Sequence, residues 1–114
     1  MTKIEAIKAT LEHHKENLRL LETVEGGFVN DWLVYYFIIG KTKISYDGPD
    51  CALCQKYSKP CCWDCPLYQH GYGCNEKNSP WQKIRYSETK PEAILVEKGM
   101  IKVLEKVLRK EEAL

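Results

Sequence analysis

Residues 51–74 read Cys51-Ala-Leu-Cys54-Gln-Lys-Tyr-Ser-Lys-Pro-Cys61-Cys62-Trp-Asp-Cys65-Pro-Leu-Tyr-Gln-His70-Gly-Tyr-Gly-Cys74, and all 6 cysteines of the chain lie in this stretch. It contains two Cys-x-x-Cys pairs. Such a pair can present both sulfurs to one ion from a single tight turn, and two pairs complete the tetrahedral set of thiolates that a structural Zn²⁺ takes. The stretch therefore predicts a loop region organised by structural zinc.

Six cysteines compete for four ligand positions. The preferred ligands are Cys51, Cys54, Cys62 and Cys65, and Cys74 is the candidate to replace one of them. A rival set, Cys62-x2-Cys65-x4-His70-x3-Cys74, is one residue short of the spacing of a zinc knuckle. Cys61 is expected to be a bystander. An iron–sulfur cluster also takes four thiolates and stays an alternative, whereas a redox role is less expected because no βαβ pattern surrounds either pair.

The cellular compartment influences whether clustered cysteines bind metal or form disulfides. The N-terminus shows no apolar signal-peptide core. The longest apolar run, from Trp32 to Ile39, is too short for a bilayer, which needs about 20 residues. We therefore expect a cytoplasmic protein with no membrane contact, and in a reducing compartment clustered cysteines bind metal more often than they form disulfides.

Two amphipathic helices are predicted to flank the cysteines. Residues 1–25 begin with the capping box Thr2-x-x-Glu5 and carry an apolar stripe that includes His14. Residues 89–112 begin with a second box, Thr89-x-x-Glu92, and have a broad apolar face. Packing of these stripes within the core is the expected arrangement. His14 is interpreted as a core or interface histidine.

Residues 28–46 are rich in aromatic and β-branched residues and contain Gly40-Lys41, which is typical of a tight hairpin turn. We predict a β-hairpin there, with a short buried helix as the alternative. The fold expected from the whole pattern is α+β: a single zinc-binding domain spanning residues 1–114, in which terminal helices and a hairpin surround the cysteine cluster of residues 51–74.

No nucleophile turn, phosphate-binding loop or His-Glu-x-x-His motif is present, so we expect no enzyme. The net charge of +1 gives no strong basic footprint. Aromatic side chains in and near the cysteine cluster suit either a small core or a contact surface, and those of the expected surface are Tyr57, Trp63, Tyr68 and Tyr72.

The pattern Cys51-x-Leu53-Cys54-x-x-Tyr57, Cys62-x-x-Cys65-Pro66-Leu67, Gly73-Cys74 and Ser79-Pro80-Trp81 resembles one found in short phage and prophage proteins of uncharacterised function. The run from His14 to Leu18 is similar to their helix. The resemblance covers about half of the chain and implies a viral or mobile-element origin and a shared metal fold, without an activity. The chain departs from that pattern at Trp63-Asp64, where the family has a glycine.

These observations favour a non-enzymatic zinc-binding interaction module, which the resemblance would make a phage accessory protein that binds and modulates a host or viral protein in the host cytoplasm. A knuckle-like nucleic-acid-binding protein is the first alternative, and an iron–sulfur or redox protein is the second. The sequence leaves the partner and the oligomeric state open.

Overall fold

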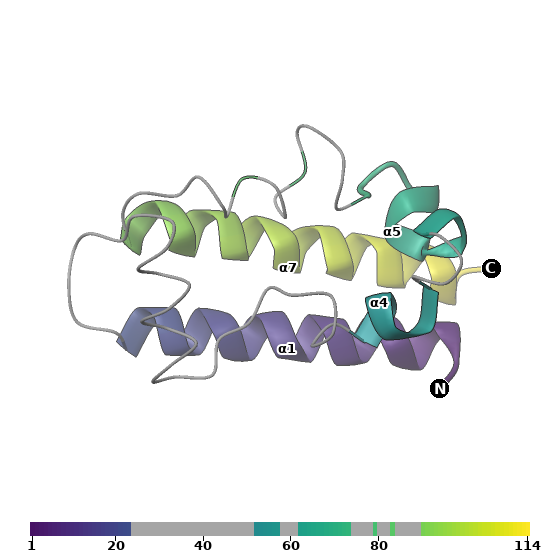
Figure 1. Ribbon diagram of the computed structural model, residues 1–114, viewed down its shortest axis with the longest axis horizontal. Helices are drawn as coiled ribbons and strands as arrows, with labels where there is room; N and C mark the ends of the chain where they lie inside the picture. The colour runs from purple at the N-terminus through teal and green to yellow at the C-terminus, as the bar shows by residue number, and fades with distance from the viewer. Residues whose placement is uncertain (24–51, 58–61, 74–78, 80–82, 84–89) are drawn as a thin grey trace.

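The computed structural model describes residues 1–23, 52–57, 62–73, 79, 83 and 90–114. Its elements, in chain order, are the long helix α1 (Lys3–Thr23), three short helices α4 (Ala52–Tyr57), η3 (Cys62–Asp64) and α5 (Pro66–Gln69), and the long helix α7 (Lys90–Glu112) (Figure 1).

The α+β prediction is wrong for the part of the chain that is described. Of these residues 85% are helical, and they contain no strand or sheet, so the fold is that of a small, mainly helical domain. The physical reason is that the two long helices bury their apolar stripes against each other and against the short helices, so a sheet is not required to cover them. The predicted hairpin at residues 28–46 lies outside the described residues.

Helix α1 begins with the predicted capping box. The Thr2 backbone N–H donates to Glu5 Oε1 at 3.0 Å, and the Glu5 N–H donates to Thr2 Oγ1 at 3.1 Å. Two N–H groups that would otherwise lack partners at the helix start are thereby satisfied. The prediction of a helix over residues 1–25 is confirmed for Lys3–Thr23.

Helix α7 extends from Lys90 to Glu112, which agrees with the predicted span of residues 89–112. Pro91 occupies the first turn, where its missing N–H removes no helical hydrogen bond. Arg109 and Lys110 lie in the last turn, and their positive charges favour the negative end of the helix dipole there.

The two long helices form an antiparallel hairpin, with both chain termini at the same end (Figure 1). The expectation that their stripes pack within the core is confirmed. Fully buried residues recur at alternating steps of three and four on both helices, as in coiled-coil packing. They are Ile7, Thr10, His14, Asn17 and Leu21 on α1, and Ala93, Glu97, Met100, Leu104 and Val107 on α7.

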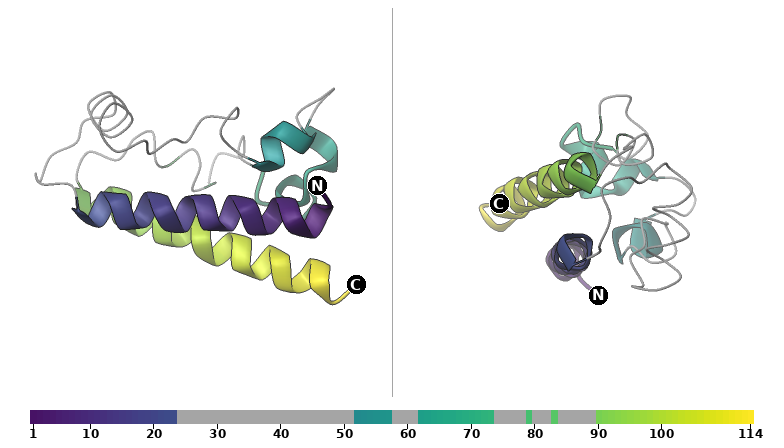
Figure 2. Two further views of the ribbon diagram at one scale, coloured as in Figure 1. Left: turned by 90° about the horizontal axis from the view of Figure 1, so that it is seen from below. Right: turned by 90° about the vertical axis from the view of Figure 1, so that its left-hand side faces the viewer.

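The short helices cover the terminal end of this hairpin (Figure 2). Leu53 of α4 and Leu67 of α5 are buried in one apolar cluster with residues of both long helices. The other members of the cluster are Ala6, Ile7, Leu11, Leu104 and Val107. The buried leucines therefore attach α4, which contains Cys54, and α5, which directly follows Cys65, to the hairpin.

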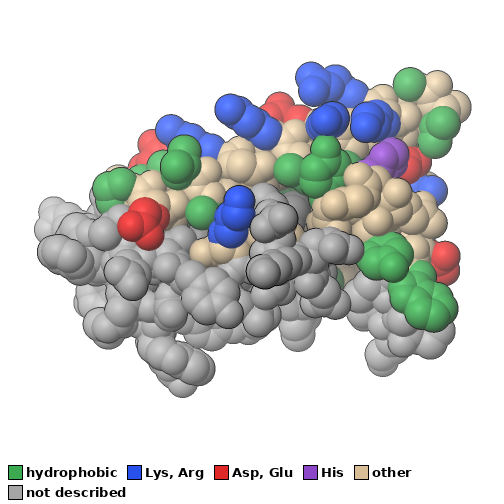
Figure 3. Space-filling view, turned by 90° about the horizontal axis from the view of Figure 1, so that it is seen from above, with side chains coloured by type: hydrophobic (Ala, Val, Ile, Leu, Met, Phe, Trp, Pro, Cys, Tyr) green, Lys and Arg blue, Asp and Glu red, His purple; other side chains and the backbone are tan. Residues whose placement is uncertain are grey.

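The outward side of α7 carries a row of Lys and Arg side chains, which is visible in Figure 3. Within the described part of the chain, each helix is either too short or too polar to cross a membrane.

Candidate metal centre

The five predicted metal ligands are described to different degrees. Cys54 lies on α4 and Cys65 directly precedes α5, and both side chains are partly buried and outside any disulfide among the described residues. Cys62 is the first residue of η3, with only its backbone described. Cys51 and Cys74 lie outside the described residues, so the predicted ligand set stays a prediction.

Helix α4 is positioned by a contact with α1. The Leu53 backbone N–H donates to Thr10 Oγ1 at 3.2 Å, and the Thr10 hydroxyl donates to the Ala6 carbonyl at 2.9 Å. Because an N–H in the first turn of a helix has no partner within that helix, Thr10 supplies the missing acceptor. This contact and the burial of Leu53 hold Cys54, the next residue, at the edge of the core.

Both ends of helix α5 have residues that are suited to helix termini. Pro66 follows Cys65 at the first helical position, where proline is favoured. Beyond the helix, Gly71 adopts a φ of +85°, its N–H donates to the Tyr68 carbonyl at 3.0 Å, and the Tyr72 N–H donates to the Leu67 carbonyl at 2.7 Å. These two bonds form a Schellman motif, whose left-handed position favours glycine.

Tyr57 connects the two halves of the cysteine stretch. It lies one turn after Cys54 on α4, and burial raises the pKa of its hydroxyl. Negative charge on Cys65, Glu111 and Asp64 raises this pKa further. Helix α4, which carries Tyr57, contacts η3, which begins at Cys62. Both Tyr57 and Cys65 pack against the apolar cluster. The structure therefore brings the region of the first pair close to that of the second.

The described residues contain no group of three or more His, Cys, Asp or Glu side chains placed to hold one metal ion. This statement concerns two of the five predicted ligands, Cys54 and Cys65, since these are the ones whose side chains are described. Thiolates at these two positions could supply half of a tetrahedral site, and the remaining ligands would have to come from Cys51, Cys62 or Cys74.

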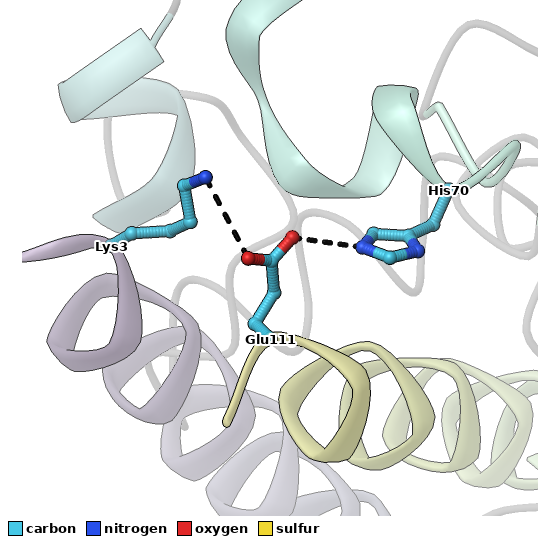
Figure 4. A network of polar contacts seen from close by, with 3 residues as sticks. All are labelled: Lys3, His70 and Glu111. Carbon is cyan, nitrogen blue, oxygen red and sulfur yellow. Dashed lines mark hydrogen bonds and ion pairs between the residues drawn. The ribbon is translucent and has the colours of Figure 1, made fainter. Parts of the chain in front are cut away.

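His70, the histidine of the rival ligand set, is held by helix α7 (Figure 4). Its Nε2 lies 2.8 Å from Glu111 Oε1, and the other oxygen of Glu111 lies 3.6 Å from Lys3 Nζ. The hydrogen bond from His70 lowers the pKa of Glu111, burial opposes this, and the charge of Lys3 lowers it further. Glu111 is therefore a carboxylate at neutral pH, so the Nε2–H of His70 donates to it.

This arrangement leaves Nδ1 as the ring nitrogen with which His70 would bind a metal. Metal-binding histidines commonly donate their other N–H to a carboxylate, so the contact with Glu111 is compatible with the rival set. The contact between His70 and Glu111 also connects α5 to α7. The sequence analysis did not identify Glu111. Its position four residues after Val107 continues the alternating spacing of buried residues on α7, and this spacing could have indicated that Glu111 is buried.

A second buried polar contact lies in the middle of the hairpin. His14 Nδ1 is 2.5 Å from Glu97 Oε1, and both side chains are almost fully buried. Glu97 Oε2 is buried as well and has no hydrogen-bond partner among the described residues. The interpretation of His14 as a core histidine is confirmed, while its acidic partner Glu97 was not expected.

The aromatic side chains of the cysteine region separate into two kinds. Tyr57 and Tyr72 are half-buried and pack against the apolar cluster. Trp63 of η3 is 68% exposed and Tyr68 of α5 is 45% exposed. The expected contact surface is therefore reduced to Trp63 and Tyr68, because the other two tyrosines contribute mainly to packing.

No protein-family model matches this chain, and neither does any curated protein or any solved structure.

Proposed function

We propose that the protein is a non-enzymatic interaction module in which a structural zinc ion fastens the cysteine region to the helical hairpin and presents aromatic side chains to a protein partner. One observation carries the proposal. Each of the two Cys-x-x-Cys pairs adjoins a short helix, since α4 contains Cys54 and α5 begins directly after Cys65, and both helices are anchored in the same apolar cluster at one end of the hairpin.

These helices are too short to persist without support. α4 has 6 residues and α5 has 4, whereas isolated helices below about 12–15 residues are marginal in water. Each buries one leucine, Leu53 or Leu67. A zinc ion held by Cys51, Cys54, Cys62 and Cys65, with Cys74 as the substitute ligand, would cross-link the two helices and add binding energy to folding.

The proposed partner surface consists of Trp63 and Tyr68. Large aromatic side chains are depleted from solvent-exposed positions and enriched at the energetic centres of protein interfaces. Trp63 and Tyr68 lie on the neighbouring elements η3 and α5, which pack against each other. The resemblance to short phage proteins makes a host or viral protein in the cytoplasm of the host cell the proposed partner.

Metal content per chain, measured by elemental analysis of untagged protein, tests the zinc site. We expect about one zinc ion, lost in Cys54→Ser and Cys65→Ser and kept in Cys61→Ser, which removes a neighbouring thiol without removing a proposed ligand. Retention of zinc in His70→Ala supports the four-thiolate set, and its loss favours the knuckle-like set. Protein without metal contradicts the proposal, and brown, iron-containing protein replaces it with an iron–sulfur site.

A further inference from the structure

The outward face of α7 is a continuous basic surface. It is formed by five exposed residues, Lys98, Lys102, Lys106, Arg109 and Lys110, which we call the basic face. Successive lysines are four residues apart, so they follow one another along the side of the helix opposite its buried residues. Figure 3 views this side, and the Lys and Arg side chains form a row along it. The protein's net charge of +1 conceals this local concentration.

Acids in the described part of the chain do not neutralise the charges of the basic face. None of its five residues forms an ion pair with a described residue. Glu105 is the one acidic residue exposed among them, and Glu112 at the end of the helix pairs with Lys8 of α1 at 4.0 Å. The positive charge of the face is therefore available to an anionic partner.

Helix α1 shows the opposite arrangement. Two of its basic residues pair with acids one turn away: Lys15 Nζ lies 3.5 Å from Glu12 Oε1, and Arg19 Nη2 lies 2.6 Å from Glu16 Oε1. The other two, Lys3 and Lys8, pair with Glu111 and Glu112 of α7. Among the described residues, every Lys and Arg of α1 therefore lies in an ion pair, whereas the five residues of the basic face do not. Pairs of this kind stabilise a solvated helix and reduce its surface charge, whereas the basic face of α7 keeps its charge for a partner.

The aromatic ring of Tyr72 adjoins the basic face at its C-terminal half. Lys106 Nζ lies 5.8 Å from the centre of the Tyr72 ring. Tyr68, 45% exposed, lies on α5, which is joined to α7 by the hydrogen bond between His70 and Glu111. A positive surface beside exposed aromatic rings is the combination with which proteins bind single-stranded nucleic acid, because lysines follow the phosphates and rings stack on bases.

We propose that the basic face of α7 binds single-stranded nucleic acid through its phosphates, with Tyr68 as a stacking position for a base. From Lys98 to Lys110 the face extends about 18 Å at 1.5 Å per residue. This length corresponds to roughly five nucleotides of one strand. The five basic residues all belong to α7, whereas the proposed zinc ligands belong to residues 51–74. Tyr68 is shared with the proposed protein-partner surface, so variants of the five basic residues test this proposal independently of the proposed function.

Fluorescence anisotropy with a labelled, mixed-sequence single strand several times longer than this tests the proposal. If about four phosphates are contacted, the logarithm of the binding constant should fall with the logarithm of salt concentration with a slope of about −3. Replacing Lys98, Lys102 and Arg109 together by Gln should raise Kd by about tenfold or more and reduce the slope by about 2. Gln is a good helix former, so the fold should be retained, and circular dichroism verifies this.

A triple variant of α1, Lys8→Gln with Lys15→Gln and Arg19→Gln, is the matched control, because it removes the same net charge. Kd for the single strand should change little in it, and Glu105→Gln should tighten binding. Trp63→Ala should leave binding unchanged, whereas Tyr68→Ala should weaken it.

Four results would overturn the proposal: no binding at low salt, equal weakening by the two triple variants, equal affinity for duplex DNA, or displacement of the strand by polyglutamate as readily as by unlabelled strand. The last would identify an acidic protein as the ligand of this face.

Discussion

The hairpin of α1 and α7 contains two sections that differ in chemistry. Near the termini, Ile7 belongs to the apolar cluster with Leu104 and Val107, and α4 and α5 cover this section. About two turns further along α1, His14 is buried against Glu97 of α7. The core of the terminal section is an apolar cluster, whereas the other section buries a His–Glu contact at its centre.

The two sections contribute differently to the fold. Burying an aliphatic side chain contributes about 1.5–3 kcal/mol whichever apolar group it meets, so the terminal section stabilises the hairpin without selecting one alignment of its helices. A buried carboxylate is costly unless a partner meets it. Glu97 meets His14 in one alignment, so we expect the polar section to specify the register and the apolar section to provide the stability.

The largest effect is expected when the polar contact loses one member. In the His14→Leu variant, the side chain of Glu97 stays buried but loses its contact with the imidazole. Removing one partner of a buried pair typically lowers the free energy of unfolding by about 3–5 kcal/mol. Urea denaturation, followed by circular dichroism, measures the loss in the free energy of unfolding.

The double variant His14→Leu with Glu97→Leu is the matching control. Because an apolar pair replaces the polar one, we expect it to recover most of the loss or to exceed wild type in stability. If the polar contact specifies the register, the double variant should also show altered helix pairing or oligomeric state by light scattering. A stable His14→Leu variant would contradict the comparison.

Leu104→Ala should have the next largest effect, because Leu104 is 0% exposed in the apolar section. Removing a buried leucine costs about 2–5 kcal/mol through lost burial and the cavity that remains. Leu95→Ala on the same helix is the control: Leu95 is 71% exposed, so a change of no more than about 0.5 kcal/mol is expected. Equal losses in the two variants would mean that the apolar section does not have the described packing.

Much of the helical hairpin could be predicted from local signals. The capping box of Thr2 and Glu5 marks the start of α1, and stripes at steps of three and four indicate which faces are buried. His14 was recognisable as a core residue because it falls on such a stripe. These features depend on residues close together in sequence, and single-sequence reasoning can use them directly.

Glu97 and Glu111 could not be identified in the same way. A glutamate on a helix is usually solvated, and the reasons for burying these two lie far away in the sequence, at His14 and at His70. For the described residues, the α+β expectation failed for a related reason: the mutual packing of the two terminal helices depends on residues far apart in sequence, and local patterns do not reveal it. The cysteine spacing indicated a metal site but could not select its ligands.

The smallest loss of stability is expected for Glu111, which forms the polar contact between α7 and His70 in the terminal section. Its side chain is 7% exposed and accepts a hydrogen bond from His70, so Glu111→Gln should cost about 1–2 kcal/mol near neutral pH. Because its pKa is lowered by folding, this contribution is present in full above the unfolded pKa of about 4.3 and is lost as pH falls through the folded value. The difference in stability between wild type and Glu111→Gln, measured by urea denaturation across this range, should therefore narrow on acidification.

The control is Glu112→Gln, which alters a half-exposed carboxylate 4.0 Å from Lys8. This variant should cost no more than about 0.5 kcal/mol of stability. A difference for Glu111→Gln that stays constant down to the lowest pH would show that the charge of Glu111 contributes nothing to the stability of the terminal section.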